Sequence, residues 1–291
     1  MEAYMAGDIN KDNSFLIRFR SSVILMIITV ASIVLGGYVL WGVSLAVTLI
    51  GLMELYRAVK VNKAPVAFTG YLAAIGWYVL VLLGFINNSK PFEDEKGFAL
   101  LVVIFLIILL GFYVFGFPKH NSEQITMIFF GLFYVAFTLS CIFRLRVTGG
   151  GAYTVWLIFI GSWGADTSAY LVGRKIGKHK IVPVLSPKKS LEGFIGGVIG
   201  AVLIGVIYAL IFNAQLKEFF SEPVLDFAII SAVASVVSMI GDLAASAIKR
   251  DKQIKDYGRL IPGHGGILDR FDSVIFIAPI VYYLVGFIAR N

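Results

Sequence analysis

The sequence has few charged residues, one cysteine and three histidines. Only 15% of its 291 residues are charged, whereas 58% are apolar and the mean hydropathy is +0.86. Soluble globular proteins are about 25% charged. This shortage excludes a disordered chain and an ordinary soluble domain, because only a membrane offers a solvent for so much apolar surface. The single cysteine, Cys141, excludes an intrachain disulfide, and no Cys/His cluster suggests zinc.

The sequence also lacks the phosphate-binding motifs of soluble nucleotide enzymes. It contains no G-x-x-x-x-G-K-[ST], no G-x-G-x-x-G and no G-x-S-x-G. Its net charge is +7, yet no soluble basic domain exists to bind a nucleic acid. We therefore expect no nucleic-acid partner, and we expect the basic residues to face anionic lipid headgroups or an anionic substrate.

Long apolar runs make up most of the chain and predict an all-α, polytopic integral membrane protein. The stretch Val23–Met53 is too long for one span, at about 46 Å as a helix, so we expect a hairpin of two short helices broken at Gly36-Gly37. With it, the prediction is about nine transmembrane helices. The other seven are Ala64–Ile86, Gly97–Phe117, Ile125–Phe143, Tyr153–Gly173, Leu191–Phe212, Asp226–Ile248 and Phe271–Ala289.

The distribution of basic residues predicts the orientation. If the N-terminus is cytoplasmic, 19 of the 25 basic residues lie on the cytoplasmic side, in agreement with the positive-inside rule. We expect a cytoplasmic N-terminal segment (1–22), N-terminal transmembrane helices (23–150) and a catalytic transmembrane region (151–291). The cytoplasmic loops 174–190 and 249–270 hold 12 of the basic residues, so the chemistry is predicted in the C-terminal half.

Asp166 and Asp242 lie within predicted spans. A charge at the bilayer centre costs at least about 2.5–3.5 kcal/mol, so such residues face the bundle interior or a water-filled cavity. Each aspartate has either a structural interhelical hydrogen bond or a functional role. Ser238, Asp242, Ser246 and Lys249 recur at helical spacing, which predicts a polar stripe on one helix face leading to the cytoplasm.

Asp269 and Asp272 stand three residues apart at the start of the last span, so they also share a helix face. Carboxylates from different helices that meet in one wet cleft form an oxygen-ligand site. Hard cations such as Mg²⁺ prefer such ligands and keep waters and substrate phosphates as the others. The sequence therefore predicts a magnesium site between these helices.

The basic loops predict a phosphate site beside that metal. The segment Ser186–Ser190 places two lysines and two hydroxyls at the start of a helix, where backbone N–H groups and the helix dipole favour an anion. Loop 249–270 adds further cations and a glycine-rich stretch around His264, which we expect to be a phosphate contact or a proton carrier. Alternatively, the basic loop residues only determine the membrane orientation and contact lipid headgroups.

The segment Ser246–Asp272 resembles the signature of the phosphatidate cytidylyltransferase (CDP-diacylglycerol synthase) family. Its elements S-x-x-K-R, K-D, P-x-H-G-G and D-R-x-D are all filled. Upstream, Ala165–Tyr170, Gly173–Lys180 and Ser186–Gly193 also look like that family. The resemblance is specific from about Trp163 to Ser273 and elsewhere is only general hydropathy, with Glu54-Leu-Tyr56 as a faint further similarity.

The resemblance implies transfer of a cytidylyl group from CTP to phosphatidate, with CDP-diacylglycerol and pyrophosphate as products. It also implies a homodimer in membrane lipid, and a divalent metal, Mg²⁺, which can have K⁺ beside it. We expect an integral protein of a bacterial inner (cell) membrane with its active site on the cytoplasmic side.

The expected roles of the site residues follow from the resemblance and from the chemistry above. The metal set is Asp242 and Asp269, with Asp166 in support. The substrate and phosphate-binding set is Arg174, Ser186, Lys188, Lys189, Ser190 and Ser246. The catalytic set is Lys249, Arg250, Lys255, Asp256, His264, Arg270 and Asp272.

Two other functions remain open from the sequence. A sister transferase would act on another lipid phosphate or another nucleotide. This alternative stays open because no residue that recognises the base can be identified in the sequence. A transporter of a phosphorylated solute would use Asp166 and Asp242 as coupling sites and would show flux without chemistry. It would leave the long basic loop 249–270 unexplained.

Overall fold

The computed structural model describes residues 20–87, 95–263 and 265–289. These residues form helices and no β-strand, with two isolated bridges, Lys180 with Ser190 and Ile261 with Gly265. After a first helix, Arg20–Leu35, the elements are α2 (Gly37–Ala58), α3 (Pro65–Ile86), α4 (Glu95–Phe115), α5 (Ser122–Gly131), η1 (Leu132–Phe137), α6 (Thr138–Arg146), α7 (Gly151–Thr154), α8 (Trp156–Phe159), η2 (Ile160–Gly164), α9 (Ala165–Ile176), α10 (Leu191–Ile211), α11 (Asn213–Leu216), α12 (Pro223–Asp251) and α13 (Leu268–Ile288).

The described residues contain eight helices that are long and apolar enough to cross a membrane. The all-α, polytopic architecture is therefore confirmed. Each of the seven runs predicted outside Val23–Met53 coincides with one of these helices within a few residues. The helix Arg20–Leu35 is apolar but shorter, so the count of nine spans stays a prediction.

The predicted break in the first apolar stretch lies at Gly36, whose φ of 62° ends the first helix. Near the start of that helix, the Ser21 hydroxyl donates to the Pro262 carbonyl at 3.2 Å. Near the far end of α2, Glu54 accepts from the backbone of Ile267 and Leu268. The outer ends of both helices thus contact the chain just before and at the start of α13, and their inner ends meet at Gly36. The two helices therefore form a hairpin.

The second helix of the hairpin is longer than predicted. We expected two short helices within Val23–Met53, but α2 has 22 residues and continues to Ala58. The expected stretch ended at Met53, directly before the charged side chain of Glu54. Its carboxyl group instead has partners from another part of the chain and is 1% exposed, so the helix continues through it.

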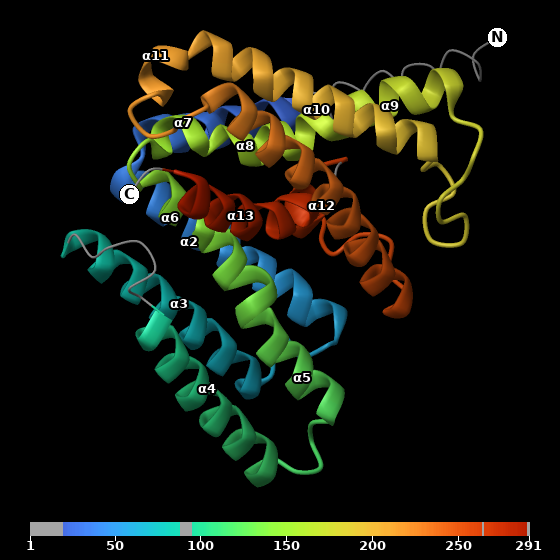
Figure 1. Cartoon of the computed structure of the whole chain (residues 1–291). Helices are drawn as coiled ribbons and strands as arrows, with labels where there is room; N and C mark the ends of the chain where they lie inside the picture. The colour runs from blue at the N-terminus through green and yellow to red at the C-terminus, as the bar shows by residue number, and fades with distance from the viewer. Residues whose placement is uncertain (1–19, 88–94, 264, 290–291) are drawn as a thin grey trace.

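Figure 1 shows α9, α10, α12 and α13 as one group of helices, and α3 and α4 side by side in another part of the molecule. Within the first group, α10 packs against both α9 and α12, and α12 packs against α13. The predicted polar loops join these helices at one end, with loop 174–190 between α9 and α10 and loop 249–270 between α12 and α13.

Small residues allow α9 and α10 to approach closely. A Cβ added at Gly196 would lie 2.5 Å from the Cβ of Val172, and one at Gly200 would lie 2.1 Å from the Ser168 hydroxyl. Such stripes are typical of helix contacts in membranes, where packing replaces the hydrophobic driving force. The buried small residues of α10 are Gly193, Gly197, Ala201, Gly205 and Ala209.

A π-helical segment, η2, interrupts the span that carries Asp166. It ends at Gly164, two residues before the aspartate, and π-bulges of this kind are frequent at functional sites. Within η2, the buried Ser162 hydroxyl lies 2.7 Å from that of Ser273 on α13. This hydrogen bond fixes the Asp166 span against the helix that carries Asp272.

Candidate functional site

A cavity of about 400 Å³ lies between α9, α10 and α12, beside the α9–α10 loop. Five predicted site residues line this cavity together, whereas the sequence alone could not show that they meet. They are Asp166, Arg174, Lys188, Lys189 and Ser190. The rest of the lining is mainly apolar and includes Ala169, Phe194, Val198 and Met239, with Ser235 and Ser238 from α12. The cavity therefore offers both charged groups and an apolar wall.

The N-terminus of α10 forms one edge of this cavity. Ser190 is the N-cap residue, and its hydroxyl accepts a hydrogen bond from the Gly193 N–H at 3.2 Å. Glu192 accepts from the backbone N–H groups of Lys178 and His179, at 3.0 and 3.2 Å. These contacts hold the loop against the helix start, where the dipole favours an anion. Glu192 therefore has a structural role, which is to bind the backbone of the α9–α10 loop.

Lys189 forms an ion pair with Asp242, which joins the α9–α10 loop to α12. Asp242 also lies close enough to Asp166 and Asp272 for their carboxylates to repel one another. Asp242 on α12 is thus within electrostatic range of one aspartate on α9 and one on α13, and the metal site between these helices stays a prediction.

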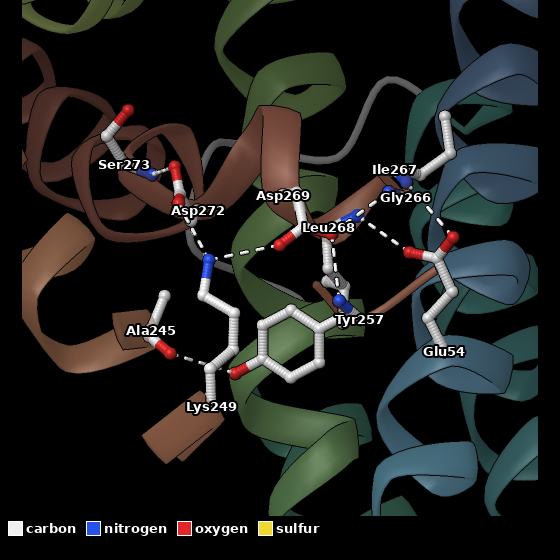
Figure 2. Close-up of polar contacts among 10 residues, drawn as sticks. All are labelled: Glu54, Ala245, Lys249, Tyr257, Gly266, Ile267, Leu268, Asp269, Asp272 and Ser273. Carbon is white, nitrogen blue, oxygen red and sulfur yellow. Dashed lines mark hydrogen bonds and ion pairs between the residues drawn. The ribbon is translucent and has the colours of Figure 1, made fainter. Parts of the chain in front are cut away.

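A second cluster surrounds Lys249 (Figure 2). Its ammonium group donates to Asp269 Oδ1 at 3.0 Å and lies 4.0 Å from Asp272 Oδ2. The other Asp269 oxygen, Oδ2, accepts from the backbone N–H groups of Tyr257 and Gly266, both at 2.9 Å. The expectation that Asp269 and Asp272 share a helix face is confirmed, and Asp269 is held through both of its oxygens.

Tyr257 belongs to this cluster, although sequence reasoning missed it. Its ring centroid lies 5.5 Å from Lys249 Nζ, which is a cation–π contact, and its hydroxyl donates to the Ala245 carbonyl at 3.3 Å. Burial raises the pKa of the Tyr257 phenol, so the hydroxyl stays protonated as a donor. An aromatic residue in an otherwise polar loop was the only available signal.

Glu54 was named only within a faint similarity to the family and was not assigned to the site, because it lies in the predominantly hydrophobic N-terminal half. Its Oε1 accepts from the Ile267 N–H at 3.1 Å and its Oε2 from the Leu268 N–H at 2.9 Å. The side chain is buried beside the start of α13 (Figure 2). A carboxyl group inside an apolar helix was the signal that could have found it.

The remaining predicted residues lie around these clusters. Ser246 is half-buried on α12 and Ser186 half-buried in the α9–α10 loop. Four residues near the start and end of loop 249–270 are exposed, namely Arg250, Lys255, Asp256 and Arg270. Asp256 lies beside Gly265, and His264 lies outside the described residues.

The carboxylates fit a cation that takes few protein ligands. Among the described residues, no three or more His, Cys, Asp or Glu side chains are placed to hold a metal ion together. Asp166, Asp242 and Asp272 lie within electrostatic range of one another, Lys189 pairs with Asp242, and Lys249 pairs with Asp269. Mg²⁺ is usually held by one or two carboxylates plus waters and phosphates, and this excess negative charge suits it.

Comparison with known proteins gives consistent matches over most of the chain. The sequence model of the cytidylyltransferase family matches residues 16–288. The phosphatidate cytidylyltransferase of Bacillus subtilis (strain 168) is 32% identical over 231 residues, which cover 79% of this chain and 71% of the relative. That of Staphylococcus aureus (strain COL) is 29% identical over 271 residues, which cover 92% and 98%. The similarity therefore extends well beyond the segment around the aspartates.

Proposed function

The chain belongs to the cytidylyltransferase family, and on this premise we propose that it transfers a cytidylyl group from CTP to phosphatidate. The products are CDP-diacylglycerol and pyrophosphate, and the chain is a nucleotidyltransferase of phospholipid biosynthesis. The observation that carries the proposal is the cavity between α9, α10 and α12. There Arg174, Lys188 and Lys189 lie beside apolar walls, as a lipid phosphate and a nucleotide require.

The reaction joins two anions. An oxygen of the phosphatidate phosphate forms a bond to the α-phosphorus of CTP, and the bond from that phosphorus to the pyrophosphate oxygen breaks. The electron pair of that bond leaves with the pyrophosphate. Because the lipid phosphate is already ionised at neutral pH, the attack needs no strong general base. The protein must instead neutralise charge and align the reactants.

Cationic side chains around the cavity do this work in our proposal. Arg174, Lys188 and Lys189 bind phosphate oxygens together with the N-terminus of α10. Lys249 holds Asp269 and Asp272 in place, and Arg250 and Arg270 supply further charge. Lys255, Asp256 and His264 shape loop 249–270 around the nucleotide. Ser186 and Ser246 add hydroxyl groups to the phosphate site.

We propose a Mg²⁺ ion at the aspartates, with K⁺ beside it as a second cation. Asp242 and Asp269 would hold the ion, with Asp166 and Asp272 in support. The chemistry that this ion supplies is neutralisation of the triphosphate and of the departing pyrophosphate. The excess of carboxylates over ammonium groups between α9, α12 and α13 supports this assignment.

The membrane placement and assembly belong to the same proposal. We place the protein in the inner (cell) membrane of a bacterium, as a homodimer, with the cavity open to the cytoplasm. The bacterial relatives and the excess of basic residues in loops 174–190 and 249–270 support this orientation. CTP then enters from water while the acyl chains of phosphatidate stay in the bilayer.

The test is product formation by the purified protein in detergent with added phospholipid. The mixture holds phosphatidate and CTP, with Mg²⁺ present or chelated, and both pyrophosphate and CDP-lipid are measured. We expect pyrophosphate release that needs both substrates, requires Mg²⁺ and equals the amount of CDP-lipid formed. No product from a protein shown to be folded would overturn the proposal. Product from a different lipid phosphate or nucleotide alone would move the assignment to a sister transferase.

A further inference from the structure

We propose that Glu54, on the second helix of the N-terminal hairpin, is a positioning residue for the site. It binds the start of α13 and thereby sets the orientation of Asp269. This inference rests on the proposed function, because it concerns the same carboxylates. It also means that the N-terminal half of the chain helps to shape the site, whereas the sequence analysis placed all of the site residues in the C-terminal half.

The first support is the geometry of the contact (Figure 2). The two oxygens of Glu54 accept separately from the N–H groups of Ile267 and Leu268, at 3.1 and 2.9 Å. Ile267 is the N-cap of α13 and Leu268 its first residue. These N–H groups have no partner inside the helix, and the dipole favours a negative group there. Glu54 therefore caps α13 from a helix more than 200 residues away in sequence.

The second support is the absence of room around the carboxyl group. A Cβ at Gly258 would lie 2.1 Å from Glu54 Oε1, and a Cβ at Gly266 would lie 2.3 Å from the same oxygen. Two parts of loop 249–270 thus approach the same carboxyl oxygen, with a glycine at each point of closest approach. The loop and the side chain fit each other closely, which a helix-capping contact alone does not require.

The third support is a short chain of contacts from Glu54 to Asp269. Glu54 fixes the backbone at Ile267 and Leu268, and the preceding N–H, of Gly266, donates to Asp269 Oδ2 at 2.9 Å. That bond turns the other oxygen, Oδ1, toward Lys249. Partners that orient a ligand in this way typically account for 10–100-fold in metal affinity or activity. Loss of Glu54 should let residues 265–268 shift and Asp269 rotate.

The experiment compares Glu54→Ala and Glu54→Gln with a matched control on the same helix. Thr48 is likewise buried on α2, and its hydroxyl lies 2.8 Å from that of Tyr78 on α3. Thr48→Val therefore disturbs α2 without touching the site. Glu54→Gln fills the same space and keeps one acceptor, so it carries the test should Glu54→Ala fail to fold.

The kinetic readout separates positioning from structure. For Glu54→Gln we expect kcat to fall about tenfold and the Mg²⁺ concentration for half-maximal activity to rise several-fold. For Glu54→Ala we expect a fall of up to about 100-fold. The KM for phosphatidate should stay within about twofold in both variants, since Glu54 does not line the cavity. Thr48→Val should keep wild-type values of all three constants.

A second readout needs no turnover. Hydrogen–deuterium exchange of peptides covering 257–268, measured without Mg²⁺, should become faster in both Glu54 variants and stay unchanged in Thr48→Val. Wild-type exchange there together with a wild-type Mg²⁺ requirement in Glu54→Gln would overturn the inference. Faster exchange with unchanged kinetics would also overturn it, since Glu54 would then only stabilise the loop. If the wild-type protein makes no CDP-lipid, the proposed function fails first, and exchange still tests the contact.

Discussion

Lys189 and Asp242 form an ion pair between the α9–α10 loop and α12, and each side chain is about a quarter to a third exposed, at 24% and 31%. A pair exposed to this degree contributes at most about 1 kcal/mol to stability. Its location matters more, because Asp242 also lies within electrostatic range of Asp166 and Asp272. Lys189 lines the cavity, so the pair connects the phosphate-binding side of the site with the carboxylate side.

Removing the charge of Asp242 should abolish turnover while the protein still folds. Asp242→Asn keeps the size of the side chain, and we expect the rate of CDP-lipid formation to fall at least about 100-fold. Asp269→Asn should behave in the same way. The control is Asp251→Asn, at the exposed end of the same helix. Wild-type activity in Asp242→Asn or Asp269→Asn would contradict the metal assignment for that residue.

Lys189 should act mainly on nucleotide binding. In Lys189→Met the apolar stem is kept and the charge is lost, so we expect the KM for CTP to rise about tenfold, the cost of one charge-assisted hydrogen bond. Lys217→Met is the matched control and should keep the wild-type KM, because Lys217 is exposed and follows the end of α10 opposite loop 174–190. An unchanged KM for CTP in Lys189→Met would exclude Lys189 from the nucleotide site.

The sequence was sufficient for the architecture, because bilayer thickness ties each apolar run to one helix. It also located the break at Gly36, where a left-handed backbone favours glycine. The length of α2 was wrong, because the partners of Glu54 come from residues 267 and 268. A carboxyl group in an apolar helix indicates that the group has a partner, but the local sequence does not identify which residues supply it.

Only part of the candidate site was predictable, because helical spacing is visible in the sequence and contacts between distant segments are not. Helical spacing placed Asp269 and Asp272 on one face, and Lys249 contacts both. The pairing of Lys189 with Asp242 depends on how a loop folds back over α12, which no periodicity specifies. Tyr257 contacts Asp269 through its backbone N–H, a group that every non-proline residue has, so this contact carries no sequence signal beyond the aromatic ring itself.

Removal of the divalent cation should lower stability as well as activity. A cation that binds only the folded protein raises the free energy of unfolding by about 2.7 kcal/mol at 100 times its dissociation constant. We therefore expect Mg²⁺ with CTP to raise the melting temperature of the wild type in detergent, and chelation to reverse the shift. Asp242→Asn should show no such shift, and a shift equal to that of the wild type in this variant would place the cation elsewhere.

The orientation can be tested with single cysteines in a Cys141→Ser background, since Cys141 is fully buried. We expect Glu218→Cys to react with a membrane-impermeant maleimide in intact cells. Arg20→Cys and Arg259→Cys should react only after permeabilisation, because the positive-inside rule places both on the cytoplasmic side. Reaction of Arg20→Cys and Arg259→Cys from opposite sides would contradict the hairpin, and inverted reactivity at all three positions would contradict the orientation.

The close approach of α9 and α10 should be sensitive to a single methyl group. In Gly196→Ala the new Cβ would meet Val172 at 2.5 Å, so the helices must separate or shift, at a cost of about 1–3 kcal/mol. We expect a melting temperature lower by several degrees and, because both helices line the cavity, a lower kcat. Gly42→Ala is the matched control, since a Cβ there meets nothing within 4 Å and alanine favours the helix. Equal stability of the two variants would show that α9 and α10 do not need to approach as closely as Gly196 allows.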